Sequence, residues 1–206
     1  MRRRPDQARF EKAKARLRTL GPVLRTRDIL RAGIHPRTLY EMRDKGILER
    51  IGPGTYRWAD LPAMGNPDLI VVAARVPHGV ICLISALAFH RLTTQVPHEV
   101  YLALQRGKAA PRLKHPPIRL FRFGGAAFTE GMEEHVLDGM PVRIYSPEKT
   151  LADCFKYRNR IGMDAPLEAL RLYRQRKRPR MDALLRFARI CRVERVMRPY
   201  LEGLFG

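Results

Sequence analysis

Glycines and prolines divide residues 25–58 into short segments, and the order of these segments limits how this part of the chain can fold. Thr26 is expected to cap a first helix, because its hydroxyl can accept a hydrogen bond from a free amide of the first helical turn. Gly33 ends that helix, and Pro36 then suits the first position of a second one, where a missing amide hydrogen costs nothing. The sequence therefore predicts two helices joined by a tight turn.

The second predicted helix runs from Pro36 to about Lys45, and a hairpin follows it. Residues 48–51 and 55–58 are predicted to form two short strands, because a turn with two glycines at 52–54 separates them. Helix, turn, helix and two-stranded hairpin in this order are typical of a winged helix-turn-helix, a fold that places its second helix in the major groove of DNA.

The outer face of the second helix is expected to carry the side chains that contact DNA. At 100° per residue, Leu39 and Met42 share the inner side, and polar residues spread over the other. Arg37 suits guanine and Glu41 suits a cytosine amino group, whereas arginines beside the hairpin would meet the DNA backbone or minor groove. The alternative is a small helical hairpin with solvated charges. The predicted DNA-contacting residues are Arg27, His35, Arg37, Thr38, Tyr40, Glu41, Lys45, Arg50 and Arg57.

The composition favours a polyanionic partner. The 206 residues include 40 Lys and Arg against 20 Asp and Glu, a net charge of +20. No run approaches the ~20 apolar residues of a transmembrane helix, so double-stranded DNA is expected rather than a membrane. Residues 1–10 are basic without the apolar core of a secretory signal, and are expected to form a flexible arm. Cys82, Cys154 and Cys191 lie far apart, as is typical of reduced packing residues in a cytoplasmic protein.

Residues 60–67 are rich in turn formers and mark the expected boundary between two domains. The first, at 1–62, is the winged helix-turn-helix, which an amphipathic helix over 7–20 completes. The second, at 66–206, mixes strands and helices and ends in helices. The chain as a whole is therefore predicted to be an α+β protein.

The second domain is expected to contain an Asp138-Gly139 type I′ turn and helices capped by Ser85 and Ser146. An exposed basic loop should cover 105–117. The predicted strands are 80–84, 99–104, 118–123, 134–137 and 142–145, and the predicted helices are 67–75, 86–92, a segment after Ser146, 164–176, 181–191 and 193–203.

Nothing in the sequence indicates catalysis, a metal site or a cofactor. His90 is more typical of a hydrogen-bonded structural residue, since no second ligand stands at metal-binding spacing. A magnesium-dependent nuclease is an alternative, but its carboxylate and lysine should be separated by one residue, and Glu148 and Lys149 are adjacent. The basic cluster at 171–180 is open to two interpretations, a contact with a polyanion or acidic partner and a solvated face.

Three phrases together resemble the AbiEi-type antitoxins of bacterial abortive-infection toxin-antitoxin systems: GILERIGPGTYRW (46–58), VPHGVICLISALAFHRLT (76–93) and VRIYSPEKTLADCFKYR (142–158). The similarity extends from about Thr19 to Tyr173. It implies an N-terminal domain that binds inverted repeats in its own promoter, and a C-terminal domain that counters a nucleotidyltransferase-like toxin in phage defence. It implies no catalytic residues. A stand-alone transcriptional regulator is the alternative, and the tail beyond Arg176 is variable in such proteins.

Overall fold

A computed structural model describes the backbone of residues 5–205 and the side chains of residues 8–205. Contacts along the chain divide it into two compact units. The first runs to Arg75 and includes Val136–Pro141, and the second comprises Val76–His135 and Val142 onward. Residues 1–4 of the predicted N-terminal arm lie outside the described residues.

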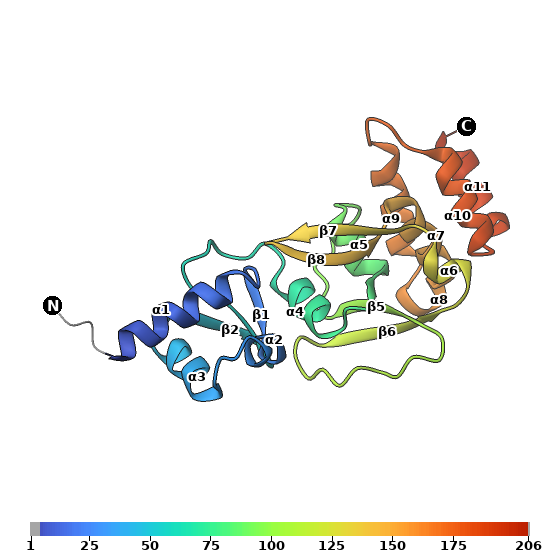
Figure 1. The fold of residues 1–206 in the computed structure, drawn as a ribbon. Helices are drawn as coiled ribbons and strands as arrows, with labels where there is room; N and C mark the ends of the chain where they lie inside the picture. Colours follow the sequence, from blue (N-terminus) through green and yellow to red (C-terminus); the bar gives the residue numbers. More distant parts are fainter. Residues whose placement is uncertain (1–4, 206) are drawn as a thin grey trace. The chain divides into compact units, whose positions relative to one another are not determined.

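The first unit contains a three-helix, three-stranded winged helix-turn-helix and one further helix (Figure 1). Its strands form an antiparallel sheet in the order β1-β3-β2, so β3 is the central strand. The elements are α1 (Pro5–Arg18), β1 (Val23–Arg25), α2 (Thr26–Arg31), α3 (Pro36–Asp44), β2 (Leu48–Gly52), β3 (Thr55–Trp58) and α4 (Pro67–Arg75).

Two details of the helix-turn-helix differ from the prediction. Thr26 does not cap α2: the helix begins at Thr26, after an extended Arg25 that makes no side-chain cap. The reason is that β1 leads directly into α2, and the amide of Thr26 donates instead to the carbonyl of Gly54 at 2.9 Å. Strand β1 itself was not predicted, because three residues are too few to show an alternating pattern.

An apolar core holds this winged helix together. Leu17 of α1, Ile29 of α2, Leu39 of α3 and Trp58 of β3 are almost completely buried in it. The indole nitrogen of Trp58 donates to the carbonyl of Gly21 at 3.1 Å, which satisfies its one polar group.

Helix α4 belongs with the first unit, which moves the boundary from the predicted 62–66 to the end of α4. It packs directly on the hairpin: a Cβ atom on Gly52 would lie 2.8 Å from a methyl group of Val71. Ile70 and Ala74 add a small apolar cluster with Met140. At Ile70, Val71 and Ala74, α4 is therefore covered by residues of its own unit.

The second unit is built on a five-stranded mixed sheet in the order β6-β5-β4-β8-β7, although the tip of the β7–β8 hairpin, Val136–Pro141, is counted with the first unit. Strands β5 and β6 are parallel, as are β4 and β8, whereas β4 and β5 are antiparallel. The strands are β4 (Val80–Ile81), β5 (Val100–Gln105), β6 (Ile118–Phe123), β7 (Met132–Leu137) and β8 (Met140–Tyr145). Asp138 and Gly139 have φ angles of 45° and 75°, the left-handed values that a type I′ turn requires.

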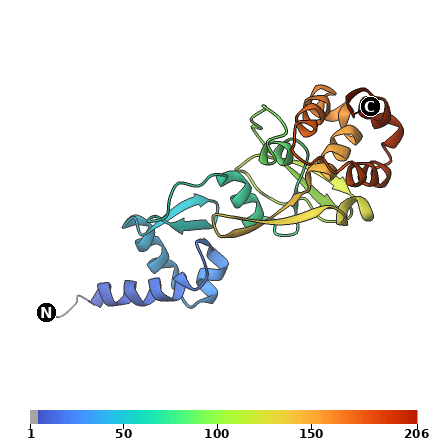
Figure 2. The ribbon, with the colours of Figure 1, turned by 90° about the horizontal axis from the view of Figure 1, so that it is seen from above.

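Helices pack around α7 in this unit, and Figure 2 shows the C-terminal helices gathered together. Ser146 caps α7 as predicted, since its hydroxyl accepts from the amide of Lys149 at 3.3 Å. The three cysteines are free and buried. The helices are α5 (Leu83–Phe89), α6 (Ala126–Thr129), α7 (Pro147–Lys156), α8 (Arg158–Ile161), α9 (Asp164–Arg174), α10 (Met181–Ile190) and α11 (Glu194–Phe205).

The segment around Ser85 was predicted wrongly. The expected strand over 80–84 ends at Ile81, and α5 begins at Leu83 rather than after Ser85. The hydroxyl of Ser85 accepts a hydrogen bond from the amide of Tyr101 at 2.9 Å, so it serves the neighbouring strand instead of capping the helix. Helices α6 and α8 were missed, because four residues are too few to show a helical period. The overall prediction of an α+β fold with an N-terminal winged helix is confirmed.

Candidate DNA-binding surface

Helix α3 presents one apolar and one polar face, as a recognition helix requires. Leu39 and Met42 are fully buried, and Thr38 is only 7% exposed. Arg37 has 79% of its side chain exposed and Tyr40 is 48% exposed. The polar face is therefore narrower than the sequence predicted, and the expectation that Thr38 points outward is wrong, because it lies one helical turn before the fully buried Met42 and shares its face.

His35 fixes the start of this helix. Its ring nitrogen Nδ1 accepts a hydrogen bond from the amide of Arg37 at 3.2 Å, and Pro36 occupies the next position. An accepting Nδ1 in a neutral imidazole leaves the proton on Nε2, which the exposed ring can offer to another molecule. His35 thus combines a capping role with a free donor at the helix N-terminus.

Glu41 lies on the polar face, but arginines already occupy both of its oxygens. Oε1 accepts from Nε of Arg37 at 2.9 Å, and Oε2 pairs with the guanidinium of Arg9. A contact between Glu41 and a cytosine amino group would require one of these pairs to open. In this arrangement the carboxylate orients Arg37, one turn earlier on the same helix, and joins α3 to α1.

Side chains in the second half of α3 and directly after it make cation–π contacts. The guanidinium of Arg43 lies 5.3 Å from the ring centroid of Tyr40, and Nζ of Lys45 lies 4.3 Å from that of Phe10. Lys45 remains exposed beyond the helix end. Tyr40 and Lys45 thus lie on the surface of the protein, as the sequence predicted.

Of the two hairpin arginines predicted to contact DNA, only one lies on the surface. Arg50 on β2 is exposed, and its Nε donates to the carbonyl of Gly52 at 3.3 Å. Arg57 on β3 is only 6% exposed, and its prediction as an outward wing residue is wrong. Its guanidinium donates to the carbonyls of Trp58, Leu61 and Pro62.

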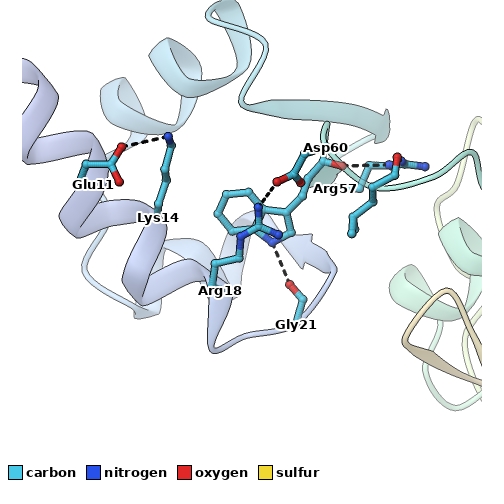
Figure 3. Close-up of polar contacts among 8 residues, drawn as sticks. Glu11, Lys14, Arg18, Gly21, Arg57 and Asp60 are labelled. Atoms are coloured by element: carbon cyan, nitrogen blue, oxygen red, sulfur yellow. Dashed lines mark hydrogen bonds and ion pairs between the residues drawn. The ribbon is translucent and has the colours of Figure 1, made fainter.

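The burial of Arg57 follows from the position of its strand. All four residues of β3 are buried, because β3 is the central strand and the segment after Trp58 folds over it. On the surface nearby, Arg18 lies over the ring of Trp58, 3.9 Å from its centroid, and pairs with Asp60 (Figure 3). These two arginines therefore close the core rather than extend the wing.

Helix α2 adds exposed cations to the same unit. Arg27 has 59% of its side chain exposed, with Nε 3.5 Å from Asp28. Arg31, one turn further along, has 79% exposed and was not among the predicted residues. Its spacing of four residues from Arg27 is the signal that could have placed it on the same face.

Metal binding and membrane insertion are two alternatives on which the described residues bear directly. Within the described residues, no three His, Cys, Asp or Glu side chains are grouped closely enough to hold a metal ion. No helix in the described part of the chain combines the length and apolar character needed to cross a membrane. His90 is hydrogen-bonded to the carbonyl of Tyr145 at 2.7 Å, which confirms it as a hydrogen-bonded residue of the second unit.

The arrangement of α2, α3 and the β2–β3 hairpin defines a winged helix-turn-helix of the type found in transcriptional regulators. Residues 11–59, from within α1 to just beyond β3, match the sequence family described as transcriptional regulator, AbiEi antitoxin. This match confirms the resemblance for the segment that carries the candidate surface. A search of curated proteins gives no match.

A likeness in fold extends over most of the chain. The crystal structure of the RV2827C protein from Mycobacterium tuberculosis is similar, with a TM-score of 0.56, and the two sequences are 18% identical. The similarity covers 91% of this chain and 72% of the other. At this identity it concerns the fold alone.

Proposed function

We propose that this chain is a DNA-binding antitoxin that acts in the cytoplasm, represses its own promoter and counters a nucleotidyltransferase-like toxin without catalytic activity of its own. The match of residues 11–59 to AbiEi antitoxin regulators supports the regulatory part. The net charge of +20 suits a partner as negatively charged as DNA.

The exposed polar face of α3 is the observation that carries this proposal. His35, Arg37 and Tyr40 occupy the start and middle of a short helix, the part that contacts base edges in helix-turn-helix proteins. Lys45 and Arg50 follow it on the surface, where they would meet phosphates. Thr38 and Arg57 are left out of the proposed surface because both are buried.

The DNA-binding part is tested by fluorescence anisotropy, with labelled duplexes from the chain's own upstream region and scrambled duplexes of equal length. We expect tighter binding to the upstream duplex and a steep loss of affinity with salt, since phosphate contacts release counterions. Arg37→Ala should weaken specific binding by about 10-fold or more if the arginine reads a base. The matched control is Arg143→Ala, which removes an exposed arginine from the second unit.

Two outcomes would overturn the DNA-binding part of the proposal. One is equal affinity for the upstream and scrambled duplexes at moderate salt. The other is an Arg37→Ala variant that binds the upstream duplex as well as the wild type does. Footprinting of the upstream region should show paired protected half-sites, because the resemblance implies inverted repeats.

The antitoxin part needs a separate experiment. If the neighbouring gene encodes a nucleotidyltransferase-like toxin, co-expression of the full chain should restore growth. The Arg37→Ala variant should restore growth equally well from an unrelated promoter, because neutralisation is assigned to the second unit. Failure of the wild-type chain to restore growth would remove the antitoxin role and leave a stand-alone regulator.

A further inference from the structure

The second unit contains a pocket of about 360 Å³ that the proposed DNA surface does not use. It lies where strands β5 and β6 end, and the C-terminal end of α7 and the turn between α10 and α11 complete its wall. Its volume falls at the lower end of the range of about 300–1,000 Å³ typical of small-molecule sites. The pocket is therefore large enough for one compact ligand.

The side chains around this pocket are predominantly cationic. Arg106, Arg122, Lys156 and Arg192 all line it, and none of them takes part in an ion pair with another described residue. Arg122 donates to the backbone carbonyl of Lys108, which holds its guanidinium in place. Four positive charges around one concavity create a strongly positive potential, which favours an anion of several charges.

The one carboxylate that lines the pocket is already neutralised. Asp153 is fully buried and pairs with Nζ of Lys149 at 2.5 Å, and its other oxygen accepts from the thiol of Cys191 at 3.2 Å. Asp153 therefore contributes little negative charge to the pocket. Among the described residues, the four cations that line the pocket therefore have no carboxylate to neutralise them.

The backbone beside the pocket, at the carboxyl ends of β5 and β6, is arranged as in known ligand-binding sites. Strands β5 and β6 are parallel, with Gln105 opposite Phe123, so their carboxyl ends open on the same side. In open parallel α/β sheets, ligands bind beyond the carboxyl ends of the strands, and the parallel pair β5 and β6 presents two such ends. Gly124 and Gly125 follow β6 directly, and Gly125 has a φ angle of 52° with nothing within 4 Å of the position of a Cβ atom. The open space beside Gly125 leaves its backbone accessible, whereas the Cβ position of Gly124 lies 3.1 Å from the side chain of Arg106.

The backbone conformation of Arg192 also favours an anionic ligand in this pocket. It follows α10 in the left-handed conformation, with a φ angle of 60°, at a position where helices usually end in glycine. Its amide donates to the carbonyl of Arg189 and the next amide donates to that of Ala188, so the helix end is well formed. An arginine at this position directs a cation to the pocket, which a glycine would not do.

We propose that this pocket binds a small molecule that carries a polyphosphate group, with a nucleoside triphosphate as the simplest example. Arg106, Lys156 and Arg192 would surround the phosphates, since charge-assisted hydrogen bonds to phosphate oxygens are strong. Phe123 and Tyr157 also line the pocket and stack on each other, with ring centroids 5.4 Å apart, which gives it an aromatic wall. A compact concavity fits one nucleotide better than the extended backbone of a nucleic acid.

Isothermal titration calorimetry on the full chain tests this proposal, with ATP, tripolyphosphate and sulfate as probes at constant ionic strength. We expect saturable binding of ATP or tripolyphosphate and much weaker binding of sulfate. Equal affinity for ATP and tripolyphosphate would identify the phosphates as the recognised group, and tighter binding of ATP would show that the nucleoside contributes. Either result supports the site.

The variants locate the binding. Arg106→Ala and Arg192→Ala should each weaken the affinity about 10-fold or more, and Lys156→Glu should weaken it further because it reverses a charge. The control, Arg171→Ala, should change it less than about 2-fold, because Arg171 is exposed and outside the pocket. Thermal midpoints of the free variants, measured in parallel, show whether each variant is folded, and all three side chains at the pocket are exposed enough to be replaced.

Three outcomes would overturn the proposal. The first is no detectable heat with ATP or tripolyphosphate at millimolar concentrations. The second is an equal loss of affinity in Arg171→Ala, which would indicate general attraction to a basic surface. The third concerns a further probe, a single-stranded oligonucleotide. If its binding alone depended on Arg106 and Arg192, the pocket would bind a nucleic acid and not a small polyphosphate. None of these results depends on promoter binding, because Arg37 and the rest of the DNA surface belong to the other unit.

Discussion

Helices α3 and α7 begin in the same way but use their polar residues in opposite ways. Each has a side-chain cap followed by proline, His35-Pro36 in one and Ser146-Pro147 in the other. Helix α3 of the first unit exposes Arg37 and Tyr40 to solvent. Helix α7 of the second unit buries every residue from Glu148 to Phe155, including Lys149 and Asp153. The start signals of a helix therefore show where it lies, but not what covers it.

An ion pair between residues four apart consequently has a different role in each of the two units. Arg37 and Glu41 are four residues apart on α3, and such exposed pairs contribute roughly 0–1 kcal/mol. Lys149 and Asp153 have the same spacing on α7 but no exposed surface. The side chain of Lys149 also lies against the ring of Tyr145, 4.2 Å from its centroid. We infer that the exposed pair serves binding and that the buried pair serves the fold.

The largest effect should come from opening the buried pair. Asp153→Ala leaves the ammonium of Lys149 without a partner in the core, and removal of one member of a buried pair costs about 3–5 kcal/mol. Urea unfolding of the full chain measures the change. The matched control, Glu41→Ala, should cost less than about 1 kcal/mol because its partners are exposed. Similar losses in both variants would contradict the contrast between the two helices.

A second prediction compares two arginines of the same hairpin. Arg57→Ala removes hydrogen bonds from a buried guanidinium to three carbonyls and should lower the stability by about 1.5–3 kcal/mol. Arg50→Ala removes an exposed side chain and should change the stability by less than about 0.5 kcal/mol. For DNA binding, Arg50→Ala should have the larger effect of the two. It should reduce the slope of log affinity against log salt by about 1, the value for one phosphate contact, and Arg57→Ala should leave this slope unchanged. Equal salt slopes for Arg50→Ala and wild type would remove Arg50 from the DNA surface.

These two contrasts show how far the sequence could predict the molecule. Elements with local signals were placed correctly: the ends of α3, the hairpin of the first unit, and the cap of α7 at Ser146. Their signals are turn residues and caps that act on their own neighbours. The α4 helix was also placed correctly, but its partner was not, because its packing on Gly52 depends on a contact between distant residues.

The errors share a cause. Arg57 was assigned to the surface by residue type, yet it is buried by a segment that local periodicity cannot place. For Arg57 the covering segment is Leu61-Pro62, whose carbonyls accept from its guanidinium. The cationic pocket of the second unit was missed for the same reason, since Arg106 and Arg192 are far apart in the sequence. Only the tertiary fold brings such residues together.

A third prediction compares the two caps directly. Ser146→Ala should cost about 1 kcal/mol, within the usual range of 0.5–2, because the cap of α7 is buried and water cannot replace the lost acceptor. His35→Ala should cost less, because the start of α3 is exposed and water can take over the role of Nδ1. Urea midpoints of the two variants measure the difference. A greater loss of stability in His35→Ala would show that α3 is held more tightly by its cap than by its core face.

The smallest expected effect concerns pH and the half-buried His90 of the second unit. Burial lowers the pKa of His90 below its ordinary value of 6.5, and the hydrogen bond between Nε2 and the carbonyl of Tyr145 opposes this shift only in part. A group whose pKa is lower in the folded state contributes stability that is fully present above the unfolded pKa. That contribution is lost as the pH falls through the folded pKa. Stability should therefore decline below about pH 6.5.

His90→Gln should make this decline shallower, because it removes the group that resists protonation. Urea midpoints recorded between about pH 8 and pH 5 test this expectation. His78→Gln is the matched control, since it removes an exposed imidazole of the same unit and should keep the wild-type slope. If His90→Gln has the wild-type slope, the decline arises from other groups. If His78→Gln alone flattens it, the exposed imidazole rather than the half-buried one couples the fold to pH.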